Sequence, residues 1–294
     1  MGGFRVEGMV ERMIIKNYLC LTHNCNLDCT HCYFHGNHIK DTLSRKSIQL
    51  ILENNKKTEL NHEYTLTGGE ATLHPDFYEI VDDLHQEKLR LDSNGYALEH
   101  FFDLVTPNEI PEIRFSIDGV KNHDLIRGIG SFKQCISSIQ KALRIGFFIE
   151  ITMTVMQTNI NDVPFVISLA KRLGVNVLNF HLATNILDEL SPLKWLETVE
   201  ILQRTTGIII KYPLRYCDKI PDDYCNCTGL QKDRITYFPD GKIRSCAVCY
   251  DILNEEDYFK TSKECGYCSR IQNITQFKKE HFIPLCIYYK RIVN

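Results

Sequence analysis

The sequence predicts an α/β protein: a partial (β/α)6 TIM-like barrel followed by a small cysteine-rich C-terminal domain. Three observations carry this prediction. Stretches rich in β-branched residues alternate six times with stretches of helical periodicity, which is typical of a parallel sheet flanked by helices. Six units fall short of the eight that close a TIM barrel. Toward the C-terminal end, apolar periodicity gives way to a segment dense in cysteine.

The expected strands and helices follow one another in regular order. Strands are expected at residues 14–21, 64–67, 89–92, 113–117, 147–155 and 175–181. Helices are expected at residues 44–55, 77–84, 98–105, 132–145 and 163–173. Gly146 and Gly174 stand directly after the last two helices, where a glycine in the left-handed conformation commonly ends a helix.

The same pattern divides the chain into three parts. The barrel is expected over residues 13–190, a linker helix over residues 191–206, and the cysteine-rich domain over residues 207–294. Within the last part we expect a hairpin of two short strands between residues 234 and 246. Its turn is Pro239-Asp240-Gly241, and these three residue types favour tight turns.

The composition is that of an ordinary globular protein. Of the 294 residues, 44% are hydrophobic and 24% are charged, and the formal net charge is −3. This balance gives no electrostatic reason to expect nucleic acid or an anionic membrane as a partner. The N-terminal segment lacks the apolar core of a signal peptide, and no apolar run is long enough to span a bilayer. A cytoplasmic location is therefore expected.

Thirteen cysteines in such a chain point to metal ligation, because the cytosol keeps thiols reduced. They are unevenly placed: three lie in one early loop and eight lie between Cys217 and Cys286. Cys20 and Cys135 stand among apolar neighbours, and we expect them in the core.

The early loop holds Cys25, Cys29 and Cys32 in the spacing CxxxCxxC. Four cysteines would complete the ligation of a [4Fe–4S] cluster, so three leave one iron open for a substrate or cofactor. A structural zinc site is the alternative, because three cysteines and one histidine can bind zinc. Histidines that could complete such a site crowd the same loop: His23, His31, His35 and His38.

Further polar motifs follow the other expected strands directly. Gly68-Gly69-Glu70 follows the second strand, a Ser-Asn-Gly turn at residues 93–95 follows the third, and an Asp-Gly pair at residues 118–119 follows the fourth. In parallel α/β sheets, ligands bind at the carboxyl ends of the strands. All these motifs are therefore expected at one end of the barrel, together with the cysteine loop.

Taken together, these motifs resemble those of radical SAM enzymes. The loop resembles the family signature CxxxCxΦC, with His31 in the slot that is usually aromatic, and the glycine motif resembles the family's GGE. By this resemblance, Cys25, Cys29 and Cys32 would bind a [4Fe–4S] cluster whose open iron chelates S-adenosylmethionine. The backbone of Gly68 and Gly69, helped by Glu70, would hold the methionyl amino group.

A second run resembles the SPASM and twitch members of that family. It begins at Ser116-Ile-Asp118-Gly119 and continues through a His-Asp pair, Arg127 and a Gly-Ser-Phe sequence that ends at residue 132. The resemblance implies that Ser116 and Arg127 bind the methionyl carboxylate, for which a guanidinium is well suited.

The cysteine-rich domain partly resembles a SPASM motif and fits the shorter twitch version better. By this resemblance, four cysteines would hold one auxiliary [4Fe–4S] cluster: Cys227, Cys246, Cys265 and Cys268. Cysteines without an assigned role would then remain, and with them a second auxiliary cluster stays an open alternative: Cys217, Cys225, Cys249 and Cys286. A zinc ribbon is the competing interpretation of two CxxC pairs in this region.

The resemblance implies an enzyme that reductively cleaves S-adenosylmethionine and removes a hydrogen atom from a substrate, with no protein residue assigned as catalytic. A ribosomally made peptide is the expected substrate, modified by cross-linking, epimerisation or oxidation. Dehydrogenation or epimerisation of a small molecule such as an aminoglycoside is the alternative, and a zinc-binding or redox-carrier protein is the non-enzymatic one. Expected partners are a reductant such as flavodoxin or ferredoxin and a separate leader-binding protein, since only 24 residues precede the first loop cysteine.

Overall fold

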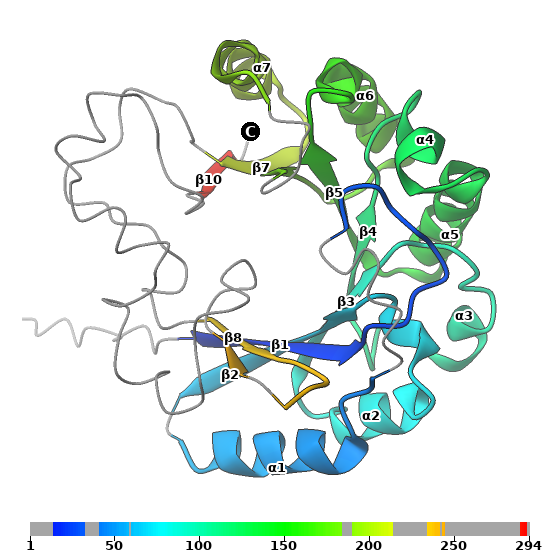
Figure 1. Cartoon of the computed structure of the whole chain (residues 1–294), viewed down its shortest axis with the longest axis vertical. Helices are drawn as coiled ribbons and strands as arrows, with labels where there is room; N and C mark the ends of the chain where they lie inside the picture. Colours follow the sequence, from blue (N-terminus) through cyan, green and yellow to red (C-terminus); the bar gives the residue numbers. More distant parts are fainter. Residues whose placement is uncertain are drawn as a thin grey trace, which may run out of the picture.

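The computed structural model describes residues 14–32, 41–58, 60–183, 190–213, 234–241, 243–244 and 289–292. In these residues one strongly curved sheet carries its helices on the convex side, so that the strands enclose the interior of an open barrel (Figure 1). The order of the strands across the sheet is β10-β7-β6-β5-β4-β3-β2-β1-β8-β9.

The central strands are parallel and consecutive, which confirms the predicted parallel α/β sheet. They are β1 (Ile14–Thr22), β2 (Asn61–Gly68), β3 (Lys88–Ser93), β4 (Glu112–Ser116), β5 (Phe148–Val155), β6 (Val177–Leu182) and β7 (Ile209–Pro213). The first six lie where the sequence places them. The seventh was not expected; it pairs in parallel with β6, so the sheet continues past residue 206.

The helices also follow the predicted order. They are α1 (Arg45–Lys56), α2 (Phe77–Asp83), α3 (Phe101–Leu104), α4 (His123–Arg127), α5 (Ser131–Ile145), α6 (Val163–Leu173) and α7 (Pro192–Arg204), with short 3-10 turns η1 (Ala71–Leu73) and η2 (Ile160–Asp162). The left-handed φ of Gly146 and of Gly174 confirms the predicted ends of α5 and α6. Helix α3 is shorter than expected, and α4 was not predicted.

Strands from late in the chain pair with both ends of this parallel sheet. Strand β8 (Arg234–Tyr237) is parallel to β1, and β9 (Ile243–Arg244) is antiparallel to β8, which confirms the predicted hairpin. Strand β10 (Tyr289–Ile292) is antiparallel to β7. The division of the chain after residue 206 stays a prediction, but these late strands belong to the barrel sheet.

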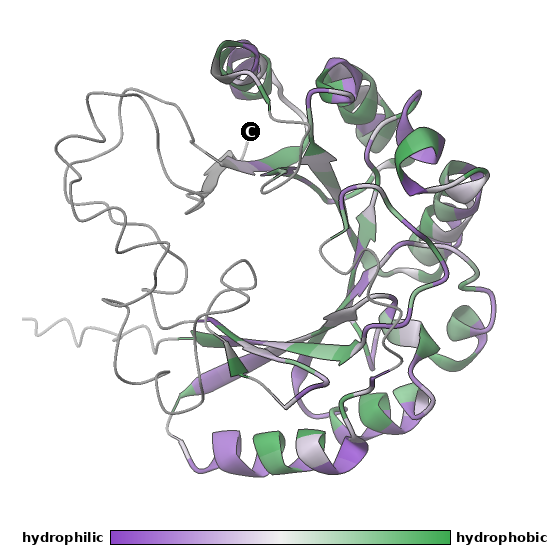
Figure 2. Ribbon diagram, viewed as in Figure 1, coloured by the Kyte–Doolittle hydropathy of each residue, from purple (hydrophilic) through white to green (hydrophobic). Residues whose placement is uncertain are grey.

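Alternation along the strands separates an apolar face from a polar one. In β5, Ile149, Ile151 and Met153 are buried against the helices, whereas Glu150 and Thr152 point to the other face because successive side chains alternate. The helices show the complementary pattern, with hydrophobic residues toward the sheet (Figure 2). The hydrophobic core therefore lies between sheet and helices, and the barrel interior is polar.

Charged residues on the interior face of the sheet, between β3 and β7, form a series of ion pairs here called the interior belt: Asp92, Arg114, Glu150 and Lys211. Arg114 on β4 donates from Nε to Asp92 on β3 at 2.8 Å, and its Nη1 lies 3.9 Å from Glu150 on β5. Lys211 on β7 donates to Glu150 at 2.5 Å. Burial raises the pKa of Glu150, but Arg114 and Lys211 lower it further, so the net pKa lies below its ordinary value. The belt therefore stays ionised and is charge-balanced within itself.

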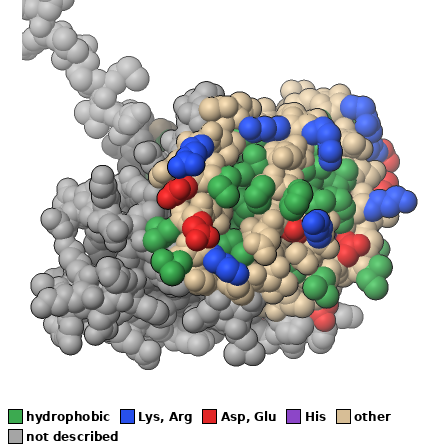
Figure 3. All heavy atoms as spheres, turned by 90° about the horizontal axis from the view of Figure 1, so that it is seen from above, with side chains coloured by type: hydrophobic (Ala, Val, Ile, Leu, Met, Phe, Trp, Pro, Cys, Tyr) green, Lys and Arg blue, Asp and Glu red, His purple; other side chains and the backbone are tan. Residues whose placement is uncertain are grey.

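The outer surface over α6 and α7 exposes hydrophobic side chains with Lys and Arg around them (Figure 3). The large exposed apolar residues on these two helices are Phe165, Leu193 and Ile201. Among the described helices, none has the length and apolar character needed to cross a membrane.

Candidate active site

The cysteine loop leaves the carboxyl end of β1 and is held there by the glycines after β2. The N–H of Gly69 donates to the Thr22 carbonyl at 2.8 Å, and the N–H of Glu70 donates to the Asn24 carbonyl at 2.9 Å. A Cβ on Gly68 would lie 2.3 Å from the Thr22 oxygen, and one on Gly69 would lie 2.4 Å from the Asn24 oxygen. The absence of a side chain at these glycines thus allows a close backbone approach, as expected. The backbone that approaches them is that of residues 22–24, where β1 passes into the cysteine loop.

The Glu70 carboxylate joins the ends of β2 and β3. It is fully buried and accepts hydrogen bonds from Thr72 Oγ1 at 2.9 Å, Ser93 Oγ at 3.1 Å and the N–H of Asn94 at 2.9 Å. Burial raises the pKa of Glu70, although these donors favour the charged form. The side chain therefore acts as a buried acceptor that fixes the turn after β3, and contact with a methionyl amino group remains a prediction.

That turn contacts the first cysteine of the loop. Asn94 Nδ2 lies 3.6 Å from Cys25 Sγ and donates to Asn26 Oδ1 at 2.8 Å. The N–H of Leu27 also points at Cys25 Sγ, at 3.4 Å. Burial raises the pKa of the Cys25 thiol, and both N–H donors counteract this rise.

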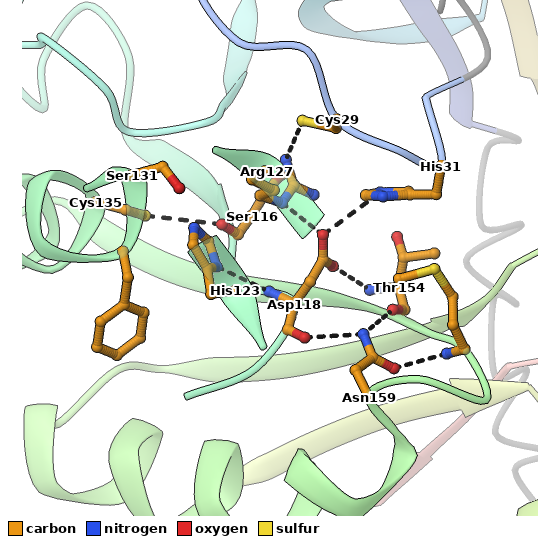
Figure 4. Close-up of polar contacts among 12 residues, drawn as sticks. Cys29, His31, Ser116, Asp118, His123, Arg127, Ser131, Cys135, Thr154 and Asn159 are labelled. Atoms are coloured by element: carbon orange, nitrogen blue, oxygen red, sulfur yellow. Dashed lines mark hydrogen bonds and ion pairs between the residues drawn. The ribbon is translucent and has the colours of Figure 1, made fainter. Parts of the chain in front are cut away.

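The second cysteine is buried beside an arginine at the end of α4. Nη1 of Arg127 lies 3.8 Å from Cys29 Sγ, while Nε donates to Asp118 Oδ2 at 2.5 Å (Figure 4). The same helix holds the loop through its backbone, because the N–H of Thr30 donates to the Ile126 carbonyl at 2.9 Å. Burial raises the pKa of the Cys29 thiol to about 12 despite the nearby guanidinium. The free thiolate is thus disfavoured, which metal ligation would offset.

Asp118 is the residue on which these contacts converge. Besides Arg127, it faces His31 Nε2 at 3.4 Å and accepts the N–H of Thr154 at 2.8 Å, and its own carbonyl accepts Asn159 Nδ2 at 2.8 Å (Figure 4). Burial raises the pKa of Asp118, but Arg127, His31 and the Thr154 N–H outweigh it and lower the pKa. Asp118 is therefore a buried carboxylate that links the cysteine loop to β4 and β5, rather than a simple turn residue.

The structure gathers the residues predicted for the front site at the carboxyl ends of neighbouring strands. These residues are Cys25, Cys29, Cys32, Gly68, Gly69, Glu70, Ser116 and Arg127. The cysteines predicted for the auxiliary cluster and the four without a role lie outside the described residues. Sequence reasoning missed the contacts of Asn94 and Asp118. The feature of the sequence that could have identified them is their position directly after the strands β3 and β4.

The donors around the loop fit a cluster held by thiolates. N–H groups from Leu27, Asn94 and Arg127 point at Cys25 or Cys29, and such donors suit sulfur ligands of iron–sulfur clusters. Within the described residues, no three His, Cys, Asp or Glu side chains converge to hold a single metal ion. Cysteines that bind a cubane each ligate a different iron, so they need not converge in this way.

Comparison with protein families assigns the front of the chain. The family model of the radical SAM superfamily matches residues 19–182, more than half of the chain. The chain belongs to this superfamily, whose members use a [4Fe–4S] cluster and S-adenosylmethionine.

Known proteins of two kinds are similar to this chain. A probable GTP 3',8-cyclase of Saccharolobus solfataricus is 27% identical over an alignment of 252 positions, which covers 78% of this chain and 81% of that protein. The crystal structure of Streptococcus suis SuiB bound to the precursor peptide SuiA shares the fold with a TM-score of 0.69 and 13% identity, over 85% of this chain and 63% of that one. Native anSMEcpe with bound AdoMet gives a TM-score of 0.68 and 17% identity, over 93% and 88%.

Proposed function

We propose that the protein reductively cleaves S-adenosylmethionine and uses the resulting radical to modify a peptide. The proposed cleavage of S-adenosylmethionine is supported by the contacts that fix the cysteine loop to the ends of the neighbouring strands. Backbone atoms after β2, Asn94 after β3, Asp118 after β4 and Arg127 on α4 all meet the loop or its sulfurs.

In this proposal Cys25, Cys29 and Cys32 hold the [4Fe–4S] cluster and leave one iron for S-adenosylmethionine. When bound, this pair supplies an electron and a 5'-deoxyadenosyl radical that removes a hydrogen atom from the substrate. The chain's own residues orient and enclose that chemistry.

The residues that we propose for the methionyl group come from the resemblance to radical SAM enzymes. The backbone of Gly68 and Gly69 with buried Glu70 would hold the amino group, and Ser116 with Arg127 would hold the carboxylate. Since Nε of Arg127 is taken by Asp118 and Nη1 faces Cys29, the carboxylate would reach this guanidinium through its remaining N–H groups. Arg127→Lys should then weaken S-adenosylmethionine binding about tenfold, because one charge-assisted hydrogen bond contributes about 1.5–3 kcal/mol.

The charge balance of the barrel interior favours a peptide over a nucleotide triphosphate. Arg90 pairs with Glu112 at 2.8 Å, and the interior belt pairs its two cations with carboxylates. Arg234 on β8 lies over the ring of Tyr18, with its guanidinium carbon 4.8 Å from the ring centroid. A triphosphate carries several negative charges, and within the described residues the interior arginines and lysine named here are already committed to carboxylates or to a ring.

A nucleotide substrate is the second candidate, because the similarity to a probable GTP 3',8-cyclase spans 78% of the chain. A small molecule such as an aminoglycoside is a further alternative. For the C-terminal region we propose one auxiliary [4Fe–4S] cluster on Cys227, Cys246, Cys265 and Cys268, and a cytoplasmic flavodoxin or ferredoxin as the electron donor.

The test is an anaerobic assay with reconstituted protein, dithionite and S-adenosylmethionine, in which 5'-deoxyadenosine is measured by chromatography. Peptides encoded beside the gene and GTP are added in parallel, and products are followed by mass spectrometry. A mass change confined to a peptide supports the proposal, and conversion of GTP alone would replace the peptide by the second candidate. A colourless protein with stoichiometric zinc and no 5'-deoxyadenosine would reject the enzyme altogether.

A further inference from the structure

The guanidinium of Arg127 lies between a carboxylate and a sulfur that is expected to bind iron. Its Nε donates to Asp118 at 2.5 Å, and its Nη1 lies 3.8 Å from Cys29 Sγ (Figure 4). The side chains of Arg127 and Asp118 are 10% and 0% exposed. Water therefore screens this charge little, and its field acts on Cys29 at short range.

The carboxylate fixes the direction of the guanidinium. The second oxygen of Asp118 accepts the Thr154 N–H at 2.8 Å, so the acceptor for Nε is anchored to β5. An arginine guanidinium stays charged at neutral pH, and here it lies against the carboxylate of Asp118.

We infer that Arg127 raises the reduction potential of the cluster bound by the loop, acting through Cys29, with Asp118 as the positioning residue. The inference rests on the proposed function, because it assumes that the three loop cysteines hold the cluster. It assigns Arg127 a role that does not depend on S-adenosylmethionine being bound.

The physical reason is the extra electron that the reduced cluster carries. A positive charge and an N–H donor beside a ligating sulfur stabilise the more negative, reduced state, and hydrogen bonds to sulfur are among the determinants of such potentials. The arrangement is also specific to arginine. Only a branched donor can reach a carboxylate with one nitrogen and a sulfur with another.

The experiment compares reduction potentials in the absence of S-adenosylmethionine. The reconstituted wild-type protein, Arg127→Gln, Arg127→Met and Arg127→Lys are titrated with EPR detection, and the front cluster is identified as the signal that changes when S-adenosylmethionine is added afterwards. Arg45→Gln is the matched control, because Arg45 also pairs with a carboxylate, Asp83, but on the outer helices.

The neutral variants should lower the ratio of reduced to oxidised cluster at a fixed potential about tenfold, which is about 59 mV for a one-electron couple. Arg127→Lys keeps the charge and should shift the potential less, and Arg45→Gln should not shift it. Two neutral variants are used because either alone could fail to load iron. If both fail to load, the lysine variant decides: a potential equal to or above that of the wild-type protein would contradict the inference, because lysine cannot reach both Asp118 and Cys29.

Unchanged potentials in the neutral variants, with weaker S-adenosylmethionine binding by calorimetry, would overturn the inference and leave Arg127 as a carboxylate ligand only. If the wild-type protein itself binds no cluster that responds to S-adenosylmethionine, the proposed function fails instead. The two failures are therefore distinguishable.

Discussion

Buried charges occupy two regions of the same barrel, and they are held in different ways. In the interior belt, Arg114 and Glu150 pair with side chains on other strands of the sheet. At the carboxyl ends of the strands, Glu70 and Asp118 accept backbone N–H groups as well, and Arg127 reaches a cysteine sulfur on a loop.

This difference teaches what each set of charges does. The charges of the interior belt are paired entirely among strands, so they act on the stability of the sheet. The charges at the carboxyl ends of the strands, here called the upper set, are Glu70, Asp118 and Arg127 with the residues that contact them. Their contacts include the cysteine loop, so they act on the positions of the three loop sulfurs. Burial alone does not mark a functional residue, whereas buried groups that converge on a loop after a strand do.

The largest expected effect concerns the loop cysteines. Replacing Cys25, Cys29 or Cys32 singly by Ala should abolish 5'-deoxyadenosine formation, because each thiolate is needed to leave one iron open for the cofactor. Iron content and 5'-deoxyadenosine are measured on the same preparations.

Cys135→Ala is the matched control, because Cys135 is a buried cysteine on α5 whose Sγ lies 3.8 Å from the Ser116 carbonyl and which is not a predicted cluster ligand. It should keep iron and activity and lose only packing. Full activity in any of the three loop variants would contradict the assignment of the cluster.

The next effect concerns the glycine that holds the loop. Gly69→Ala would place a Cβ 2.4 Å from the Asn24 oxygen, so the loop has to move. Since a displacement of about 1 Å can reduce a rate about a hundredfold, we expect a loss of S-adenosylmethionine cleavage of this order together with weaker iron binding.

Gly174→Ala separates this displacement from a general loss of stability. Gly174 ends α6 with a φ of 75°, and a Cβ there meets open space. This variant should be destabilised by its strained backbone yet retain its iron. Equal losses of iron in both variants would mean that the loop responds to global stability and not to its contact with β2.

The fold could be predicted from the sequence because its signals are local. Each of the first six strands carries β-branched or apolar residues, several of them in alternation with polar ones, and glycines mark the ends of α5 and α6. Strand β7 was missed because Ile209–Pro213 is short and stands in a region where the cysteines dominate the pattern. That β8 pairs with β1 could not be seen from the sequence, since this contact joins segments more than two hundred residues apart.

The site could be predicted only in part, because local sequence patterns do not reveal contacts between residues that are distant along the chain. Motif spacing placed the cysteine loop and the glycines together, because consecutive parallel strands end side by side. The roles of Asn94 and Asp118 arise from contacts among three or four strand ends, and no local pattern carries that information. His31 was recognised as unusual in its slot, but its partner Asp118 appears only in three dimensions.

A smaller effect tests the interior belt. Glu150→Gln should leave Lys211 without its carboxylate and weaken the contact with Arg114. Breaking a buried ion pair on one side costs about 3–5 kcal/mol, so the free energy of unfolding should fall by about this amount in urea titrations. The exposed pair of Arg45 and Asp83 gives the control, because Asp83→Asn there should change stability little. A potential or S-adenosylmethionine affinity that moved with Glu150→Gln would break the distinction between the two regions.

The smallest effect is a pH dependence that belongs to the upper set. His123 is fully buried, and its Nδ1 accepts the N–H of Asp118 at 3.2 Å. Burial and the nearby Arg127 lower the pKa of His123 to about 4, below the value of about 6.5 in an unfolded chain. Between these values the unfolded state binds a proton that the folded state does not, so stability falls as the pH falls.

His123→Asn should remove this dependence, because an amide oxygen can accept the same N–H without titrating. Lowering the pH from 7 to 5 should reduce the free energy of unfolding of the wild-type protein by about 1–2 kcal/mol more than that of the variant. Urea titrations at both pH values measure the difference. At pH 7 and above, where His123 is neutral in both states, the gap between the two proteins should stay constant. Parallel pH profiles down to pH 5 would show that His123 has the same pKa in the folded and unfolded states, and so does not hold the Asp118 N–H through an unprotonated Nδ1 at low pH.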